Sequence, residues 1–357
     1  MNSQNPRNHR SESEHPKHTM MKAIVVKEYK EWKSQNLEPV EVDKPTAGAG
    51  QVLIKAKAAA VNPIDWMVMA GFLKGAGWAQ PAPYIPGYDV AGVVEAVGEG
   101  VTDFKAGDEV FSVNWSLDVG QQMGRHDDNA GEQKKGPIAG TFAEYCVLPA
   151  NKVSKKPSKL SFEEAAGVAL VGTTAYQSLK TLGVEKGKKV LILGAAGAVG
   201  NLACQLAKSM GAYVATTASS RTMEYVKPLG VDKIINYREE KWEECSDLKD
   251  IDAVLDTVGE KEGFERAKKI VKEGGSFISI SSGDVGYVPT AHKGFKYASF
   301  YVLKNNVKDQ DTLAGMVADG KLKLKVEKTF PFTKQGVTDA FTAQTSGKSM
   351  GKNVIVF

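Results

Sequence analysis

The feature that most constrains the fold is a strand, a glycine-rich turn and a helix that follow one another within residues 190–230. The apolar run "VLIL" leads into "GAAGAVG", and a helical pattern follows. Glycine permits a tight turn and a close approach of backbone to ligand, while the helix N-terminus offers free N–H groups to a pyrophosphate. Gly197 and Gly200 match the last two positions of G-x-G-x-x-G, but Ala195 replaces the first and Gly194 lies one place earlier. The turn therefore predicts a dinucleotide site, and tight strand–helix packing without a ligand is the alternative.

The rest of the chain divides around this unit. Strands and helices alternate through residues 156–304, which predicts a doubly wound parallel sheet of the Rossmann type, an α/β fold. Residues 21–155 read as short β-strands separated by glycines, which predicts a partly open β-barrel. Residues 305–357 stop alternating, with one helix near "DTLAGMVADG" and a last strand in "GKNVIVF", so we expect them to return to the first domain.

Composition excludes several classes of function. A chain of 357 residues is long enough for two domains with a cleft between them, and a net charge of +4 without a basic stripe disfavours nucleic acid. The three cysteines, Cys146, Cys204 and Cys245, have no metal-ligand spacing. No apolar run is long enough to span a membrane, and residues 1–20 predict a disordered polar leader rather than a secretory signal. We expect a cytoplasmic protein.

The strand after the glycine turn indicates which dinucleotide binds. NAD sites usually place an acidic residue there for the ribose 2′-hydroxyl, whereas a 2′-phosphate needs cationic and hydroxyl donors. This strand ends in "ATTASSR", so Ser219, Ser220 and Arg221 are donors and an acid is missing from the segment. The sequence predicts NADPH, and an ordinary polar turn with a solvated arginine is the alternative.

Several further segments occur in order along the chain: "AAAVNPIDWMVMAG" (58–71), "PGYDVAGVVEAVGEGVTDFKAGDEVF" (86–111), "GTFAEY" (140–145), "GTTAYQSL" (172–179), "GAAGAVG" (194–200) and "INY" (235–237). Together with the glycine turn they resemble the zinc-independent quinone oxidoreductases of the medium-chain dehydrogenase/reductase superfamily, over essentially all of residues 21–357. The resemblance implies a GroES-like β-barrel domain (21–155 and 305–357) and a Rossmann NADPH-binding domain (156–304). It also implies reduction of a quinone or other α,β-unsaturated carbonyl in the cleft between them.

The resemblance also accounts for missing metal ligands. Zinc-dependent alcohol dehydrogenase relatives carry a cysteine near the position of Asn62 and Gly-His-Glu where this chain has Gly87, Tyr88 and Asp89. Residues 114–140 lack the cysteines of their structural zinc lobe, and His126 with its two acidic neighbours reads as solvated surface. We predict no metal, and without a Lewis acid alcohol oxidation is disfavoured.

Family resemblance assigns the site residues. Asn62 is expected at the nicotinamide end of the cleft, where its amide would donate to cofactor or substrate; Asp65 lies on the same turn, and Thr174 near the carboxamide. Met67 occupies a position where relatives carry a proton-donating Tyr or Lys, so the proton is expected from Tyr88, another side chain or water. The predicted catalytic residues are Asn62, Asp65, Tyr88 and Thr174. The predicted cofactor-binding residues are Asn62, Thr174, Gly194, Ala195, Gly197, Ala198, Val199, Gly200, Ser219, Ser220, Arg221, Tyr237, Val258, Gly259, Ser281 and Lys352, the last at the cofactor phosphates.

The acceptor and the assembly stay less defined. Trp66, Met67, Met69, Phe72, Trp78 and Tyr84 predict an apolar mouth for flat substrates, although core packing explains some of them equally well. The alternatives are an enoyl or 2-alkenal double-bond reductase and a non-catalytic NADPH-binding regulator. The apolar segment 296–306 predicts a homodimer, because in related proteins this sheet edge pairs across a two-fold axis.

Overall fold

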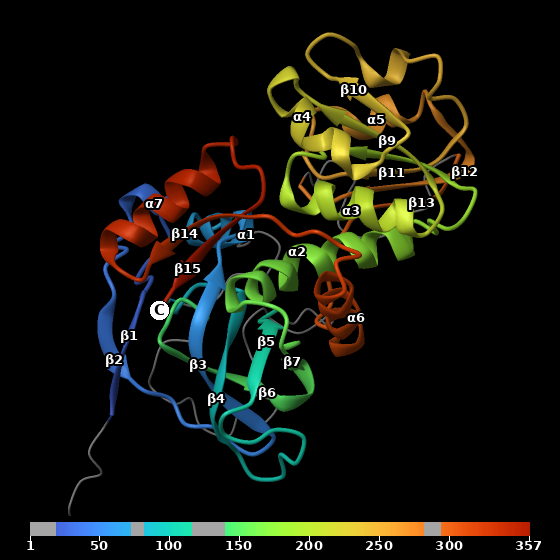
Figure 1. The fold of residues 1–357 in the computed structure, drawn as a ribbon. Helices are drawn as coiled ribbons and strands as arrows, with labels where there is room; N and C mark the ends of the chain where they lie inside the picture. The colour runs from blue at the N-terminus through green and yellow to red at the C-terminus, as the bar shows by residue number, and fades with distance from the viewer. Residues whose placement is uncertain (1–18, 73–81, 116–139, 282–293) are drawn as a thin grey trace, which may run out of the picture.

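The computed structural model describes residues 19–72, 82–115, 140–281 and 294–357. Figure 1 shows two bodies: the N-terminal strands and the C-terminal segment form one, and the central part of the chain forms the other. No helix within the described ranges is long and apolar enough to cross a membrane. Residues 1–18 of the predicted leader lie outside the described residues, and Met20 already belongs to a strand.

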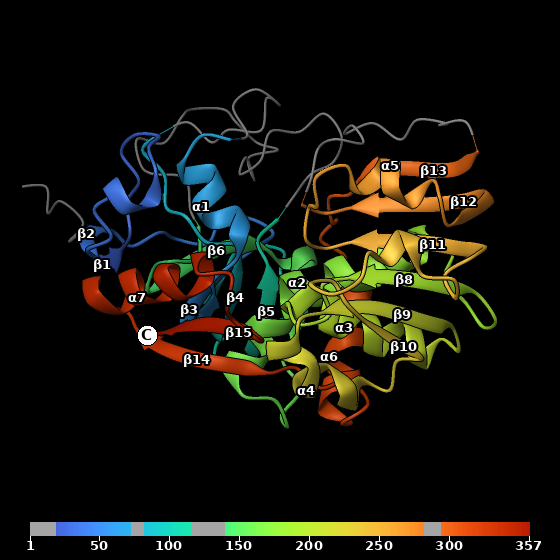
Figure 2. The same ribbon diagram turned by 90° about the horizontal axis from the view of Figure 1, so that it is seen from above.

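The central body is a six-stranded parallel sheet in the order β10-β9-β8-β11-β12-β13. Its strands run along one direction with their carboxyl ends at one edge, as Figure 2 shows. Helix α3 packs on β8 and β9, and α5 packs on β12. This confirms the predicted Rossmann sheet. The elements are β8 (Lys189–Leu193), α3 (Ala198–Ser209), β9 (Tyr213–Ala218), α4 (Met223–Val226), β10 (Lys233–Asn236), β11 (Ile251–Asp256), α5 (Gly263–Ala267), β12 (Val271–Ser279) and β13 (Phe295–Phe300).

The other body is built on a seven-stranded sheet, β14-β15-β3-β4-β5-β7, with β6 also paired to β3, and on the small sheet β1-β2. Strand β15 pairs antiparallel with β3, so the chain's last strand lies beside one of its first. The C-terminal segment therefore adds its last strand to the sheet of the N-terminal strands. The elements are β1 (Met20–Ala23), β2 (Val40–Asp43), β3 (Gln51–Ala60), α1 (Pro63–Met69), β4 (Asp89–Val97), β5 (Glu109–Val113), β6 (Tyr145–Pro149), β7 (Ser154–Lys155), α6 (Val307–Ala318), β14 (Val326–Pro331), α7 (Lys334–Thr345) and β15 (Lys352–Val356).

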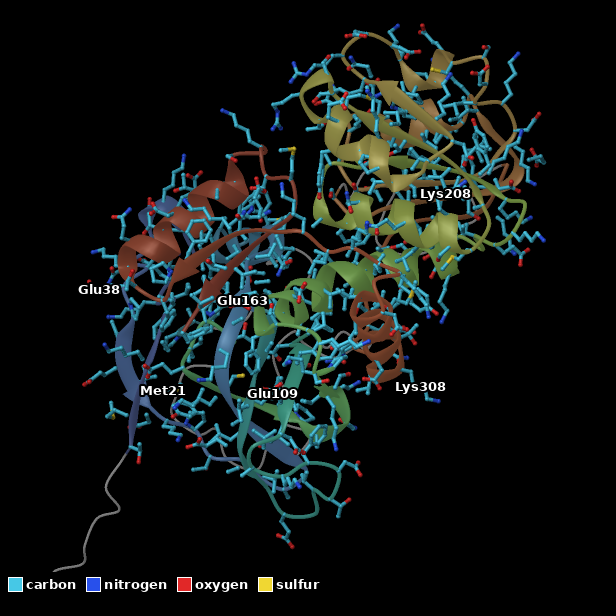
Figure 3. The ribbon with its side chains drawn as sticks, viewed as in Figure 1. Met21, Glu38, Glu109, Glu163, Lys208 and Lys308 are labelled. Atoms are coloured by element: carbon cyan, nitrogen blue, oxygen red, sulfur yellow. The ribbon has the colours of Figure 1, made fainter. Side chains whose placement is uncertain are left out.

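Helix α2 (Phe162–Thr181) lies where the two bodies meet, between the barrel strands and α3 (Figure 1). It begins at Ser161, whose hydroxyl accepts from the Glu164 N–H at 3.1 Å while the Glu164 carboxylate accepts from the Ser161 N–H at 2.9 Å. Glu163, labelled in Figure 3, adds negative charge to this first turn, where the helix dipole favours it. Most of the helix is buried, so α2 is a rigid support for both domains.

Two parts of the sequence folded differently from expectation. Residues 305–357 contain β14 and α7 in addition to the predicted helix and strand. The small α1 was not predicted either, although Asn62 followed by Pro63 is a common helix start, because proline at the first helical position loses no hydrogen bond. All three cysteines are free thiols, two of them buried.

Candidate active site

The glycine turn after β8 is built by two glycines that the fold itself requires. Gly194 has φ +88°, a left-handed conformation, and a Cβ there would lie 2.6 Å from Val258 Cγ2. A Cβ on Gly200 would lie 2.2 Å from the Gly194 carbonyl oxygen. The Gly194 N–H donates to Thr217 Oγ1 at 2.9 Å, which holds the turn against β9. Packing of the strand, the turn and the helix therefore accounts for glycine at both positions without a ligand.

Gly197 is different. It precedes α3 with an ordinary φ of −75°, and the nearest atom to an added Cβ, the Gly194 oxygen, is 3.5 Å away. Packing therefore does not require glycine here, and the missing side chain leaves the backbone open to a ligand. Ala198, Val199 and Gly200 form the first turn of α3, whose N–H groups have no acceptor within the helix. This opening fits a pyrophosphate group.

A second turn at the same edge of the sheet completes the surface. Asp256, the last residue of β11, accepts from the N–H groups of Val258 and Gly259, each at 2.9 Å. Ser281 Oγ donates to the Thr257 carbonyl at 3.1 Å, so the ends of β11 and β12 lie together. Val258 is 54% exposed, an unusual value for an apolar side chain beside a glycine turn. The sequence did not single out Asp256, although an acidic residue at the end of a buried strand was a signal for it.

The serine–arginine turn follows β9 as predicted. Ser220 Oγ accepts from Asn236 Nδ2 at 2.9 Å, and Arg221 Nη1 donates to the Lys348 carbonyl at 3.2 Å, which links the two bodies. Ser219 is buried and caps the turn through Thr222 rather than facing outward.

An acid does lie at this turn, which corrects the sequence argument. Ser220 Oγ donates to Glu239 Oε1 at 3.4 Å. Glu239 comes from the loop after β10, beyond Tyr237, whose side chain is half exposed. Sequence reasoning considered only the segment directly after β9 and so missed a carboxylate supplied by the next strand's loop.

A buried polar cluster joins α1, β4 and β15. Lys352 Nζ donates to Asn62 Oδ1 at 2.6 Å and to the Val61 carbonyl at 2.9 Å. Asn62 Nδ2 donates to Asp89 Oδ2 at 2.8 Å and to the Ala60 carbonyl at 3.2 Å. Lys352 Nζ lies 3.8 Å from Asp89 Oδ2. Asn62 and Asp89 are fully buried and Lys352 is 2% exposed, so water does not compete for these contacts.

This cluster changes two predicted roles. Both ends of the Asn62 amide have partners within the chain, so in this arrangement it has no hydrogen to donate to a cofactor or substrate. Lys352 directs its ammonium into the cluster rather than toward cofactor phosphates. The asparagine instead begins α1 and orients the charges around it. Sequence reasoning did not predict Asp89 as a member.

The cluster holds two carboxyl groups. Asp65 Oδ2 accepts from the Asn62 N–H at 2.7 Å, while its Oδ1 is buried with no hydrogen-bond partner among the described residues. Burial, with the neighbouring charge of Asp89, raises the pKa of Asp65 well above its usual range. Burial also raises the pKa of Asp89 to about 6, although Lys352 and Asn62 act against it, and lowers the pKa of Lys352.

Thr174 and Tyr88 are positioned by neighbours of this cluster. The Leu170 N–H of α2 donates to Asp89 Oδ1 at 2.8 Å, and Thr174 Oγ1 donates to the Leu170 carbonyl at 2.8 Å. Tyr88 is buried against Trp115, with ring centroids 5.0 Å apart, and burial raises the pKa of its phenol well above its usual range. A buried phenol of raised pKa is a weak acid, which does not favour Tyr88 as proton donor.

The predicted apolar mouth is only partly present. Trp66 and Phe72 form an edge-to-face pair with centroids 6.0 Å apart, and Phe72 is exposed. Met69 and Tyr84 are fully buried core residues, so they do not face a substrate. Trp78 and His126 lie outside the described residues.

The chain is similar to known proteins both in sequence and in structure. Residues 48–158 match the alcohol dehydrogenase GroES-like domain and residues 229–355 the zinc-binding dehydrogenase family. The chain is 36% identical to a 2-methylene-furan-3-one reductase of Solanum lycopersicum, over 93% of this chain and 80% of that protein. It is 34% identical to a chloroplastic NADPH-dependent alkenal/one oxidoreductase of Arabidopsis thaliana, over 93% and 81%. The solved quinone oxidoreductase from Coxiella burnetii superposes with a TM-score of 0.76 at 30% identity, covering 95% of this chain and 100% of that one.

The second family description names zinc, but the residues of the cluster are already engaged with one another. Asn62 has its amide engaged on both sides, and Asp89 is shared between Asn62, Leu170 and Lys352. A lysine ammonium already lies against these groups. Across the described ranges, no three His, Cys, Asp or Glu side chains are grouped as metal ligands would be. These residues do not fit a catalytic zinc.

Proposed function

Because this chain belongs to the medium-chain dehydrogenase/reductase superfamily, among its quinone oxidoreductases and alkenal reductases, we propose that it is an NADPH-dependent reductase of quinones and other α,β-unsaturated carbonyls. The observation that carries the proposal is Gly197, whose missing side chain serves no packing need and opens the backbone at the start of α3. Bound there, the cofactor would supply a hydride.

The residues of the chain would bind the cofactor and orient it toward the acceptor. The N–H groups of the first turn of α3 would hold the pyrophosphate, and the exposed guanidinium of Arg221 would hold the 2′-phosphate. The hydroxyl of Ser220 already donates to Glu239 and accepts from Asn236. Val258 and the Ser281 turn would line the cofactor path. Thr174, whose hydroxyl donates to the Leu170 carbonyl of α2, would contact the nicotinamide end.

Proton delivery is assigned to water rather than to a side chain. Met67 cannot donate, Tyr88 is buried with a raised pKa, and Asp65 is enclosed in the cluster. Reduction of a quinone or of a conjugated double bond yields an oxyanion or enolate, which solvent protonates. We therefore expect the acceptor reaction to need no proton from an ionisable side chain of the protein.

The test is NADPH consumption with a simple quinone and with an α,β-unsaturated aldehyde, each at equal concentration. Turnover with both supports a broad reductase, and turnover with the aldehyde alone supports the alternative, a 2-alkenal double-bond reductase. Binding of NADPH without consumption of it by either acceptor would instead make the protein a non-catalytic NADPH-binding regulator.

Metal independence is part of the same proposal, since the cluster residues do not fit zinc. Exhaustive chelation should leave the rate unchanged. Stoichiometric zinc that is lost together with activity would contradict it.

The proposal extends to a homodimer. Strand β13 is the last strand in the order of the Rossmann sheet, and it carries Tyr297 and Phe300 on a largely apolar segment. Pairing with a second copy would cover that edge. Light scattering should give a mass of about 77 kDa, twice the 38.4 kDa chain, whereas a 38.4 kDa particle would show that the chain is a monomer.

A further inference from the structure

The buried cluster contains a charge arrangement that the proposed reaction does not use. Asp89 and Lys352 are the first residues of β4 and β15, and Asn62 immediately precedes α1. Asn62 and Lys352 are 290 positions apart in the chain. Buried ionised groups are retained only when they are paired, because removing them from water is costly.

We propose that Lys352 is a positioning residue, whose ammonium holds the Asn62 amide and the Asp89 carboxylate in one arrangement and thereby fixes the part of α2 that carries Thr174. The inference concerns the folded protein itself, and it rests on the proposed function only for its kinetic readout.

The first step is the orientation of Asn62. Its oxygen faces the ammonium at 2.6 Å and its nitrogen faces the Asp89 carboxylate at 2.8 Å. Turning the amide over would point the NH₂ group at an ammonium and the oxygen at a carboxylate, both repulsive. The cation and the anion therefore favour the same single orientation of the amide.

The second step leads from Asp89 to α2. One carboxylate oxygen of Asp89 accepts from Asn62 and the other accepts from the Leu170 N–H at 2.8 Å. The Leu170 carbonyl in turn accepts from Thr174 Oγ1. The side chain of Lys352 also runs beside this helix, because a Cβ on Gly167 would lie 3.7 Å from Lys352 Cβ. Displacing the Asp89 carboxylate would thus disturb the Thr174 turn.

The third step is the charge count. Asp89 and Asp65 are both enclosed. The Lys352 ammonium pairs with Asp89 and also acts electrostatically on Asp65. In a family whose description names zinc, the positive charge in this cluster is supplied by the chain itself. Removing the ammonium leaves Asp89 as a buried anion without a counter-ion. Removing both charges leaves Asp65 as the remaining carboxyl, and burial favours its neutral form by raising its pKa.

The experiment is a double-mutant cycle with Lys352→Met, Asp89→Asn and the combined variant, followed by thermal unfolding without cofactor. We expect K352M to lower the Tm by roughly 6–12 °C, because a broken buried pair leaves an uncompensated charge. The combined variant should recover at least half of that loss. Lys321→Met, which removes an exposed lysine paired with Asp319, is the matched control and should shift the Tm by about 2 °C or less. K352M that fails to fold while the combined variant folds gives the same answer, and a combined variant no more stable than K352M overturns the proposal.

Kinetics separate positioning from cofactor binding. K352M should lower kcat with a quinone at least about tenfold while the KM for NADPH changes by less than about threefold. A raised KM for NADPH with an unchanged kcat would overturn the proposal, because it would place the ammonium on the cofactor phosphates. If the wild-type protein consumes no NADPH with any acceptor, the proposed function fails while the Tm cycle still decides the role of Lys352.

Discussion

The glycine turn and the buried cluster are built differently, the first from backbone and the second from side chains. The turn is made of backbone from seven consecutive residues, 194–200, and contains no ionisable group. The cluster is made of side chains from α1, β4, β15 and the residue before α1, held by hydrogen bonds between residues as far as 291 positions apart. The turn is therefore sensitive to volume and insensitive to pH, whereas the cluster should respond to charge.

The largest effect is expected from adding one methyl group to the turn. Gly200→Ala places a Cβ 2.2 Å from the Gly194 carbonyl oxygen, and backbone cannot retreat cheaply. We expect a loss of at least about 3 kcal/mol of unfolding free energy, at the upper end of overpacking costs. Chemical denaturation measures it.

Gly197→Ala is the matched control for the same methyl group. Its Cβ meets only the Gly194 oxygen at 3.5 Å, so stability should fall by no more than about 1 kcal/mol, the cost of alanine at a helix start. NADPH affinity should fall at least about tenfold, because the methyl fills the space meant for the phosphates. Unchanged NADPH binding in the Gly197 variant would mean that the pyrophosphate lies elsewhere.

This contrast also explains what could be predicted from the sequence. The turn was found because its strand, glycines and helix are adjacent in the chain, and the alternation around it predicted the parallel sheet. The cluster was not found, because nothing local in "GKNVIVF" indicates that Lys352 reaches Asn62. Asp89 was noted only as a replacement for a metal ligand. Side-chain partners at long range depend on the packing of β15 against β3, which no local pattern encodes.

The next effect is the pH dependence of stability, to which the cluster contributes through Asp89. Burial raises the pKa of Asp89 to about 6 in the folded protein, above its unfolded value of 3.8, while Lys352 from β15 lowers it and Asp65 from α1 lies nearby. A raised carboxyl pKa stabilises the fold below the unfolded value, and this stabilisation is lost as the pH rises through about 6. Asp89 should thus contribute a decrease of up to about 3 kcal/mol between pH 4 and 7.

Asp89→Asn removes the titrating group, so its unfolding free energy should vary less over that range. The difference between wild type and variant, measured by denaturation at each pH, isolates Asp89 from the other carboxylates. The Gly197→Ala protein should keep the wild-type pH dependence. Parallel curves for wild type and Asp89→Asn would mean that Asp89 does not titrate in this range.

A smaller effect is expected where the cofactor surface is made of exposed side chains. Arg221 donates to the Lys348 carbonyl through one nitrogen, which leaves the rest of the guanidinium for a 2′-phosphate. Losing such a charge-assisted contact costs about 1.5–3 kcal/mol, or roughly 10- to 150-fold in affinity. Arg221→Ala should weaken NADPH binding by that factor and leave NADH nearly unchanged in a fluorescence titration. An equal loss for both cofactors would show that Arg221 does not read the 2′-phosphate.

The smallest effect concerns Glu239, the acid that the sequence argument missed. Its carboxylate lies against Ser220 Oγ, on the same turn as Arg221, so it opposes a 2′-phosphate and suits a free ribose 2′-hydroxyl. The group is exposed, and screened repulsion between surface charges a few ångströms apart is worth only about 0.5–1 kcal/mol. Glu239→Gln should therefore tighten NADPH binding about two- to fivefold without tightening NADH. Glu240→Gln is the matched control, because the Glu240 carboxylate accepts from Cys245 Sγ instead of Ser220. If both variants tighten NADPH equally, the effect is one of net charge. If only Glu239→Gln tightens NADPH binding, Glu239 in the loop after β10 opposes the 2′-phosphate that Arg221 attracts. The preference between NADPH and NADH then depends on the balance of these two residues.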